Sequence, residues 1–440
     1  MTLLDLTPRV AADDRLAALP VLIIGAGPIG LAAAANLASR GIDFTILESG
    51  DRAGESIRLW GHTRLFSPWR HLIDPASRRL LNAAGWAAPA DEDRAPTGHE
   101  LVEDYLEPLA ALPEIGSRIR FGTRVIAVAR EGMDRTRTAG REKAPLLLRV
   151  QVGDSTAEEL IGRAVIDASG TYATPNPLAS NGLDPIGAAD VAGLVRHALP
   201  DVLGAERASF AGKRVVVVGA GHSAANTLIT LAELARTEPR TEVSWLIRNP
   251  SALRVSSSAD DELADRAKLG HRVDALVASG AVAQIDSFEI TRLQAHDGGV
   301  RLIGRRRGED AFLDADVVVN ATGFRPDLSM LREIRLELDD VVEAPRRLAP
   351  LIDPNVHSCG TVAPHGFAEL RHPEPGFFLV GMKSYGRAPT FLLATGYEQV
   401  RSITAWLDGD IPAATEVQLT LPATGVCSTE SASGGGSCCS

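Results

Sequence analysis

Cysteine is scarce in this chain. Four cysteines occur among 440 residues, and Cys359 is the first of them. So few thiols exclude a disulfide framework, and we interpret Cys359 as a small packed residue. The other three, Cys427, Cys438 and Cys439, lie close together near the end of the chain.

Long apolar runs and basic tracts are also lacking. No run reaches the roughly 18 apolar residues that a membrane-spanning helix needs. The net charge is −11, and we interpret the longest basic tract, Arg305–Arg307, as a solvated hairpin turn. Asp5, Asp13 and Asp14 stand where a secretory signal would be basic. We therefore expect a cytoplasmic protein without a membrane or nucleic-acid partner.

What the chain does contain is a strand, turn and helix pattern near its start. With 45% hydrophobic residues, 440 residues suffice for two or three cores. Val21–Ile24 is a short continuous apolar run, typical of a strand buried on both faces. A glycine cluster follows it, and then an alanine-rich helix to Ser39 and a second strand over Phe44–Leu47. The pattern predicts a βαβ unit.

The glycine cluster Gly25-Ala-Gly-Pro-Ile-Gly30 predicts that this unit binds a dinucleotide. Gly25 permits the tight turn, Gly27 lets the backbone approach a pyrophosphate, and Gly30 allows close packing of helix on strand. The phosphates would lie at the helix N-terminus. Glu48 ends the second strand at about the spacing of an acid that hydrogen-bonds the ribose.

A second fingerprint, Gly219-Ala-Gly-His-Ser-Ala224, follows the apolar run Arg214–Val218. The next strand, Val243–Ile247, ends in Arg248 where the first unit has an acid. A cation there suits a ribose 2′-phosphate, so the sequence favours NADPH over NADH. The alternative is an exposed arginine at a strand end.

Two further strands, within Ala164–Gly170 and Val317–Gly323, end on small residues, as expected where backbone passes against a cofactor. A plain tight turn would use the same residues. Proline in Ala173–Pro177 predicts an extended linker. Phe377–Val380 predicts another buried strand, and Pro389 marks the start of a helix that runs to Leu407.

Several of these segments resemble the flavoproteins that bind two dinucleotides, most closely the flavin-containing monooxygenases. The resemblance spans residues 20 to about 408 and rests on Gly25–Gly30 with Glu48, Asp167–Pro177, Phe210–Ala224 and Asn320–Asp327. The family signature FxGxxxHxxx(Y/F) is present at Gly193 and His197. It departs at Val191 and Asp201, which indicates a divergent branch.

The resemblance implies an α/β fold with two Rossmann-like dinucleotide-binding domains, the NADPH domain inserted into the FAD domain. We expect an N-terminal lead over 1–19, the FAD-binding domain over 20–185 and 310–410, the NADPH-binding domain over 186–309, and a flexible cysteine-containing tail over 411–440. FAD and NADPH are the expected cofactors, and a small-molecule substrate and O2 are the expected partners. A homodimer is left open.

The resemblance also implies the site residues. The segment Trp60–Trp69 would run along the flavin, although core packing is the alternative for both tryptophans. The candidate cofactor contacts are Gly25, Gly27, Pro28, Gly30, Glu48, Ser49, Trp60, Arg64, Ser67, Val125, Ala168, Gly170, Gly219, Gly221, His222, Ser223, Arg248, Ala321, Thr322, Gly323 and Phe391. No catalytic side chain is identified, because the cofactor supplies the chemistry.

The implied reaction is NADPH-dependent reduction of FAD, followed by transfer of one oxygen atom from O2 to a soft nucleophile. Two alternatives stay open, a flavin-dependent disulfide or metal(loid) reductase and a non-catalytic redox sensor. The first is disfavoured because residues 20 to 180 lack the cysteine pair that such reductases carry beside the flavin.

The C-terminal thiols support a narrower hypothesis about the substrate. Cys427, Cys438 and Cys439 suit soft ions such as trivalent arsenic, and the tail resembles those of flavoproteins encoded with arsenic-detoxification genes. A flexible tether of about 28 residues would let the thiols reach about 30 Å from its anchored end. The alternative is a disordered terminus with incidental cysteines.

Overall fold

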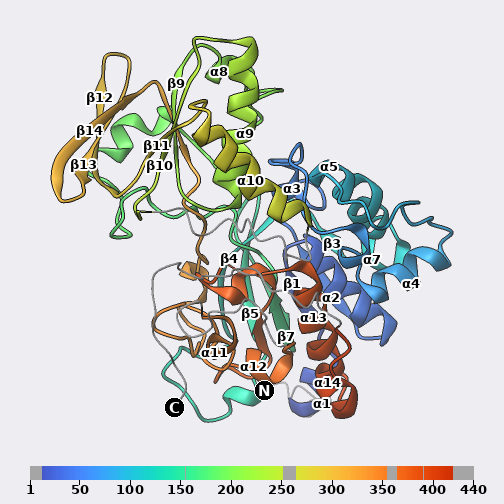
Figure 1. Ribbon diagram of the computed structural model, residues 1–440. Coiled ribbons are helices and arrows are strands. Elements are labelled where there is room, and N and C mark those ends of the chain that lie inside the picture. The colour runs from blue at the N-terminus through green and yellow to red at the C-terminus, as the bar shows by residue number, and fades with distance from the viewer. Residues whose placement is uncertain (1–11, 154, 251–263, 354–363, 390, 420–440) are drawn as a thin grey trace, which may run out of the picture.

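The computed structural model describes residues 12–153, 155–250, 264–353, 364–389 and 391–419. It shows two α/β units, and the second is inserted into the first (Figure 1). Among these residues, no helix combines the length and the apolar character needed to cross a bilayer.

The first unit is built on a parallel sheet of five strands. In spatial order they are β16 (Phe377–Leu379), β7 (Ala164–Asp167), β1 (Val21–Ile24), β2 (Phe44–Leu47) and β3 (Ile119–Arg120). All four residues of β1 are buried, as its continuous apolar run predicted. The central strand β1 pairs with both β2 and β7.

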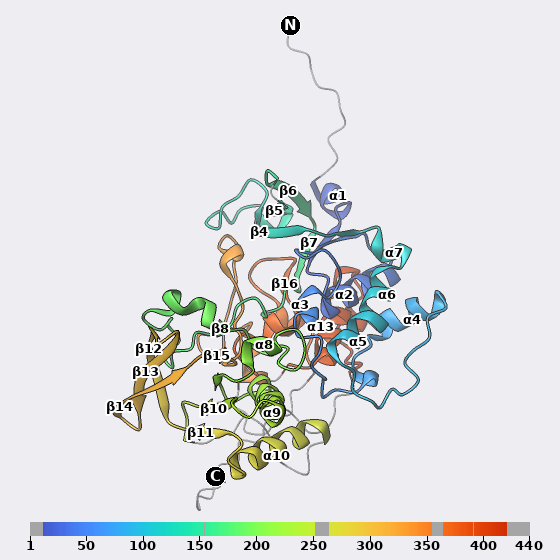
Figure 2. The ribbon, with the colours of Figure 1, turned by 90° about the horizontal axis from the view of Figure 1, so that it is seen from above.

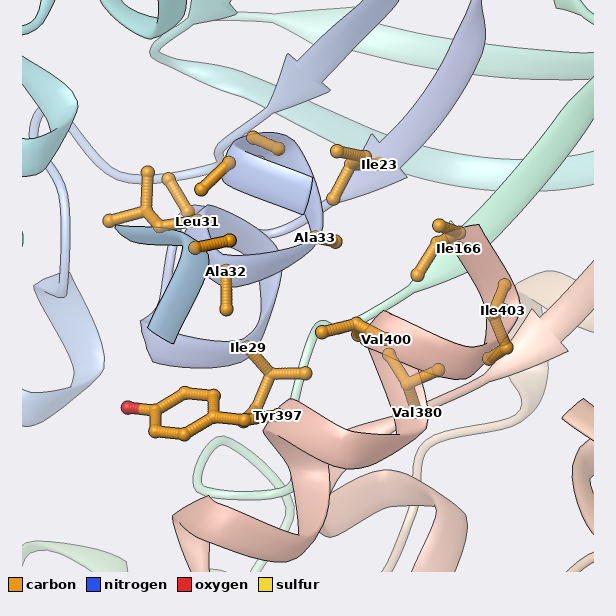
Figure 3. Close-up of a cluster of buried hydrophobic side chains, with 14 of the residues drawn as sticks. Ile23, Ile29, Leu31, Ala32, Ala33, Ile166, Val380, Tyr397, Val400 and Ile403 are labelled. Atoms are coloured by element: carbon orange, nitrogen blue, oxygen red, sulfur yellow. The ribbon is translucent and has the colours of Figure 1, made fainter. Parts of the chain in front are cut away.

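The two faces of this sheet are covered differently. Val21 and Ile23 belong to a core shared with α2 (Pro28–Ser39) and α13 (Leu393–Leu407). Figure 3 shows Ile23 in this core with Ala33 of α2 and Val400 of α13. Leu22 and Ile24 pack instead on an antiparallel sheet of β4 (Thr123–Arg130), β5 (Leu146–Val152) and β6 (Glu158–Gly162). This alternation follows from the two-residue period of a strand.

Shorter helices complete the first unit. They are α1 (Ala12–Ala17), α3 (Glu55–Arg58), η1 (Trp69–His71), α4 (Pro75–Ala83), α5 (Gly98–Leu101), η2 (Val102–Leu106), α6 (Glu107–Ala110), α7 (Pro113–Gly116), η3 (Arg141–Lys143), η5 (Ser329–Leu331), α11 (Ala349–Ile352), α12 (Phe367–Leu370), η6 (Gly381–Tyr385) and α14 (Ile411–Thr415).

The second unit repeats the same three layers. Its parallel sheet has the order β11 (Ala283–Ile285), β10 (Glu242–Leu246), β9 (Arg214–Val218), β15 (Val317–Asn320) and β8 (Val195–Arg196). Helices α9 (His222–Thr237) and α10 (Ala264–Ala278) cover one face, and α8 (Arg207–Phe210) lies nearby (Figure 2). The short helix η4 (Ala188–Leu194) packs on the opposite face. The antiparallel strands β12 (Phe288–His296), β13 (Gly299–Arg306) and β14 (Glu309–Ala315) cover the other face.

Two neighbouring segments of chain connect the units, at residues 171–177 and 320–326. The backbone N–H of Asn176 donates to the Gly323 carbonyl at 2.9 Å, and the backbone N–H of Arg325 donates to the Thr174 carbonyl at 3.0 Å. His197, from the partly matched signature, lies 4.4 Å from the Tyr172 ring, measured between centroids. The predicted linker, Ala173–Pro177, is therefore part of one of the two neighbouring segments, the crossovers, that connect the units.

These crossovers correct the predicted domain limits. The boundary between 309 and 310 falls inside β14, which pairs along its length with β13. Next in the chain, β15 pairs in parallel with β9, so the second unit extends to Asn320. At the other limit, Leu178 already packs with the core residues of β9, which places the boundary before 185.

Two further expectations fail near the C-terminus. The helix predicted from Pro389 begins at Leu393, so this proline lies before the helix and not in its first turn. Residues 411–419 were assigned to a flexible tail, but Ile411–Thr415 form α14. The Ser402 hydroxyl donates to the Ala414 carbonyl at 2.6 Å and fixes α14 on α13.

Candidate dinucleotide sites

The first fingerprint forms a turn that only glycine can make. Gly25 has a φ of +99°, and a Cβ on it would lie 2.9 Å from the Ala168 carbonyl oxygen. A Cβ on Gly30 would lie 1.9 Å from the Gly25 carbonyl oxygen. These contacts pack the start of α2 against the ends of β1 and β7, as predicted for Gly25 and Gly30.

The start of α2 fits a pyrophosphate. Its N-cap residue, Gly27, has no side chain that could cap the helix, and the first turn contains no acidic residue. A Cβ on Gly27 would meet nothing within 4 Å. Pro28 occupies the first turn, where its missing N–H costs nothing. Backbone N–H groups and the helix dipole therefore face open space, as an anionic ligand such as the FAD pyrophosphate requires.

Glu48 lies beside this turn and is almost fully buried. Its carboxylate accepts hydrogen bonds from the backbone amides of Ala26 and Gly50, both at 2.7 Å. The Ser49 hydroxyl donates to the same carboxylate at 3.4 Å. Glu48 thus orders the loop around the fingerprint, and its contact with an adenosine ribose stays a prediction.

The predicted flavin-side segment divides into core and surface. Trp69 is completely buried, and Trp60 is half-buried against the same core, so core packing accounts for Trp69. The Arg64 guanidinium is half-exposed and donates to the Ala95 carbonyl at 2.6 Å. Ser67 is half-buried. Flavin contacts of Trp60, Arg64 and Ser67 stay predictions.

The second fingerprint repeats the geometry of the first. Gly219 has a φ of +134°, and its Cβ would lie 2.1 Å from the Ala321 carbonyl oxygen. Gly221 caps α9 without a side-chain hydrogen bond, and its Cβ would meet nothing within 4 Å. Ala224, in place of a third glycine, is fully buried. This helix start also fits a pyrophosphate.

A cleft of about 500 Å³ opens over this second helix start. It gathers predicted residues from several strand ends, namely Gly219, Gly221, His222, Ser223, Arg248, Ala321, Thr322 and Gly323. Arg248 is exposed just after β10, and its contact with a ribose 2′-phosphate stays a prediction. The second fingerprint and Arg248, which were predicted to bind NADPH, therefore share one cavity with the strand-end residues 321–323, which were predicted to meet a cofactor.

Sequence reasoning missed the opposite wall of this cleft. Met382, Arg387, Ala388 and Pro389 line it from the first unit. The loop 176–182, Asn249, Phe288, Ile290 and Arg325 line it from the crossovers and the second unit. The sequence predicted only the strand before this loop, Phe377–Val380, and the helix after it, and neither indicated that the loop lines the cleft.

A second contact joins the two units. The ring of Phe66, which lies in the flavin-side segment, is 5.4 Å from the ring of His222 at the start of α9. The segment that was predicted to follow the flavin therefore touches the second fingerprint. Phe66 was not among the predicted residues, because a lone aromatic in a loop carries no positional signal.

The remaining candidates lie in the first unit. Val125 belongs to β4 and packs against the core beneath β1. Ala168 and Gly170 follow β7, beside the first fingerprint. The Phe391 ring meets Tyr385 edge-on at 5.2 Å, just before α13. Cofactor contacts of Val125, Gly170 and Phe391 stay predictions.

The predicted soft-metal thiols, Cys427, Cys438 and Cys439, lie outside the described residues. Within the described part of the chain, no cluster of three His, Cys, Asp or Glu side chains could hold a metal ion.

Known proteins share this architecture. The sequence profile of the pyridine nucleotide-disulphide oxidoreductase family matches residues 22–139 and 149–357. Indole-3-pyruvate monooxygenase YUCCA6 of Arabidopsis thaliana is 30% identical over 210 residues, which cover 48% of this chain and 44% of that protein. The chain therefore spans less than half the length of this relative.

Solved structures of low sequence identity share the fold. Bacillithiol disulfide reductase of Bacillus cereus superposes with a TM-score of 0.64 at 20% identity, over 88% of this chain and 99% of that chain. The FAD-bound cadaverine monooxygenase DfoA of Erwinia amylovora gives 0.61 at 14% identity, over 92% and 99%. The predicted α/β fold is confirmed, and the family match agrees with the predicted class, an oxidoreductase that uses FAD and NADPH.

Proposed function

The chain belongs to the pyridine nucleotide-disulphide oxidoreductase family, and on this premise we propose that it is an NADPH-dependent FAD monooxygenase. The reaction takes up NADPH, a proton, O2 and a soft nucleophilic small molecule. It releases NADP⁺, water and the substrate carrying one oxygen atom. FAD, held at the first fingerprint, supplies the redox chemistry when bound.

One observation carries this proposal. The cleft over the second fingerprint is closed on its far side by Met382, Arg387, Ala388 and Pro389 of the first unit. A nicotinamide dinucleotide with its pyrophosphate at α9 therefore extends toward the unit that binds the flavin. This placement supports hydride transfer within one chain, because the nicotinamide would face the flavin unit without a domain crossing solvent.

Two observations favour a monooxygenase over a reductase, namely the lack of a cysteine pair in the first part of the chain and the similarity to a known monooxygenase. A disulfide reductase of the kind considered requires a sulfur pair beside the flavin, whereas no cysteine precedes Cys359. The family match alone fits both chemistries. Similarity to YUCCA6, an indole-3-pyruvate monooxygenase, favours oxygen transfer.

The decisive measurement is the fate of O2. Purified FAD-loaded enzyme is supplied with NADPH, ¹⁸O2 and a panel of soft nucleophiles that includes a thioether, a tertiary amine and arsenite. We expect one ¹⁸O atom in the product per NADPH consumed, with little H2O2 released. Complete conversion of O2 to H2O2 with every substrate would refute the monooxygenase proposal, and NADPH-driven reduction of a disulfide or metal(loid) would establish the reductase alternative. Absence of turnover would indicate a redox sensor.

For the substrate, we propose a trivalent arsenical. Three thiolates match the preference of As(III) for soft ligands, and a weakly bound substrate gains local concentration when it is held near the enzyme. Replacement of Cys427, Cys438 and Cys439 by serine should raise the KM for arsenite and leave thioether oxidation unchanged. Unchanged arsenite affinity and turnover in that variant would refute the role of the tail.

A further inference from the structure

The turn η6 lies between the two predicted cofactor sites. It follows β16 at the carboxyl edge of the first sheet, and its second residue, Met382, lines the NADPH cleft. Its first residue, Gly381, approaches the start of α2, where a Cβ would lie 3.1 Å from Ile29. Any displacement of η6 therefore changes both the packing at the first turn of α2 and one wall of the cleft.

A buried lysine anchors η6 to the neighbouring strand. The Lys383 ammonium donates to an Asp167 carboxylate oxygen at 2.8 Å and to the Ser169 hydroxyl at 3.0 Å. The side chains of Lys383 and Asp167 are 1% and 0% exposed. Ser169 in turn donates to the second Asp167 oxygen at 2.6 Å. This network adjoins Ala168, whose carbonyl packs against Gly25 of the fingerprint.

A buried glutamine anchors η6 from the other side. Gln399 of α13 accepts a hydrogen bond from the Gly381 amide at 2.7 Å and donates to the Ser384 hydroxyl at 3.0 Å. Ser384 donates to the Gly381 carbonyl at 2.7 Å, which closes the loop of hydrogen bonds. Both peptide polar groups of Gly381 are thus fixed by side chains.

A buried ion pair is a costly way to stabilise a fold, since apolar residues of the same volume often serve as well or better. Here the pair lies at the junction of two cofactor sites, and its oxygens and ammonium are hydrogen-bonded. We propose that Lys383 and Gln399 are positioning residues that hold η6 in place between the predicted FAD and NADPH sites. The proposal rests on the two-cofactor assignment and not on the fate of O2.

The test compares Lys383→Met with a matched control, Arg130→Met. Arg130 is 1% exposed and lies 2.6 Å from the Glu374 carboxylate, at the amino end of β16, the end opposite η6. Both substitutions remove one buried cation from the same unit. Measurements are bound FAD per chain, the visible circular dichroism of the flavin, its midpoint potential, and anaerobic reduction by NADPH in a stopped-flow instrument.

Lys383→Met should slow flavin reduction at saturating NADPH by about tenfold or more, because misplacement by about 1 Å costs up to 100-fold. Its flavin dichroism should change, and its Kd for NADPH should stay within about threefold. Arg130→Met should leave all of these signals unchanged. The proposal fails if Lys383→Met reduces its flavin at the wild-type rate with a wild-type spectrum, or if Arg130→Met shifts both signals equally.

Two more variants keep the test decisive if Lys383→Met does not fold. Asp167→Asn with Lys383→Met removes both charges, so no unpaired carboxylate is left buried. Gln399→Leu removes the second anchor without a change of charge. We expect slower reduction and altered flavin dichroism in both. Wild-type rates and spectra in both folded variants would overturn the proposal, whereas uncoupled O2 consumption alone would bear only on the monooxygenase assignment.

Discussion

Alanine at Gly27 and alanine at Gly30 should have opposite consequences, although both residues belong to one fingerprint. Gly27 has φ −80° and ψ −174°, which alanine adopts without strain, and its Cβ would meet no protein atom within 4 Å. Gly30 has no such room, because its Cβ would lie 1.9 Å from the Gly25 carbonyl oxygen. The new Cβ and the Gly25 carbonyl oxygen are both attached directly to the backbone, so only a backbone shift can relieve the contact.

For Gly27→Ala, two small effects on the apoprotein oppose each other. Alanine reduces the entropy of the unfolded chain, which contributes about 0.4–1 kcal/mol to stability. It is also a poorer N-cap than glycine, at a cost of about 0.5–1 kcal/mol. The free energy of unfolding of the apoprotein should therefore change by less than about 1 kcal/mol.

The binding of FAD should respond differently. The new methyl group of Gly27→Ala fills the space proposed for the pyrophosphate, and overpacking of this kind costs about 1–3 kcal/mol. FAD affinity should fall about 5- to 150-fold. Gly30→Ala should instead destabilise the apoprotein itself by about 3 kcal/mol, since helix and turn must separate.

The assay uses apoproteins stripped of FAD. Urea unfolding, followed by tryptophan fluorescence, gives stability, and FAD titration gives affinity. Wild-type FAD affinity in Gly27→Ala would refute the placement of the pyrophosphate at the start of α2. Equal destabilisation of both apoproteins would refute the geometric argument that separates the two glycines.

Two other predictions concern coenzyme choice and acid stability. Arg248→Ala should lower kcat/KM for NADPH about 10- to 100-fold, the value of a charged hydrogen bond, and leave NADH unchanged. Arg236→Ala, at the far end of α9, is the control, and equal losses with NADPH and NADH would contradict the 2′-phosphate role. Burial lowers the pKa of His372 to about 4 from its usual 6.5. As pH falls through this interval the unfolded chain takes up the proton first, so stability is lost by up to about 3 kcal/mol. In urea unfolding at pH 7.5 and pH 5, His372→Asn should lose less stability than wild type, and parallel losses would refute this account.

The sequence predicted those parts of the fold that are formed by residues close together in the chain. Val21–Ile24, the turn at Gly25 and the helix to Ser39 lie next to one another in the chain, so their order and periodicity identify a βαβ unit. The second fingerprint was identified in the same way, and Arg248 was placed at its cleft. In these cases each residue meets its structural partner within one supersecondary unit.

The domain boundary could not be predicted in this way. Val317–Asn320 was identified as a buried strand but assigned to the wrong unit, because an apolar run does not specify the strand with which it pairs. Helix α13 begins at Leu393 and not at Pro389, so the proline preceded this helix without marking its first turn.

The sequence by itself therefore determined that two glycine-rich turns of the dinucleotide-binding type exist, and which charged residue follows the second strand of each unit. Glycine spacing and strand-end charge are local properties, and they act through backbone conformation and Coulomb attraction over a few residues. Only the tertiary structure decided how the two sites meet. Lys383 and Asp167 lie far apart in the sequence, and the pairing of β16 with β7 brings them to 2.8 Å. Burial then excludes the water that would otherwise weaken their contact.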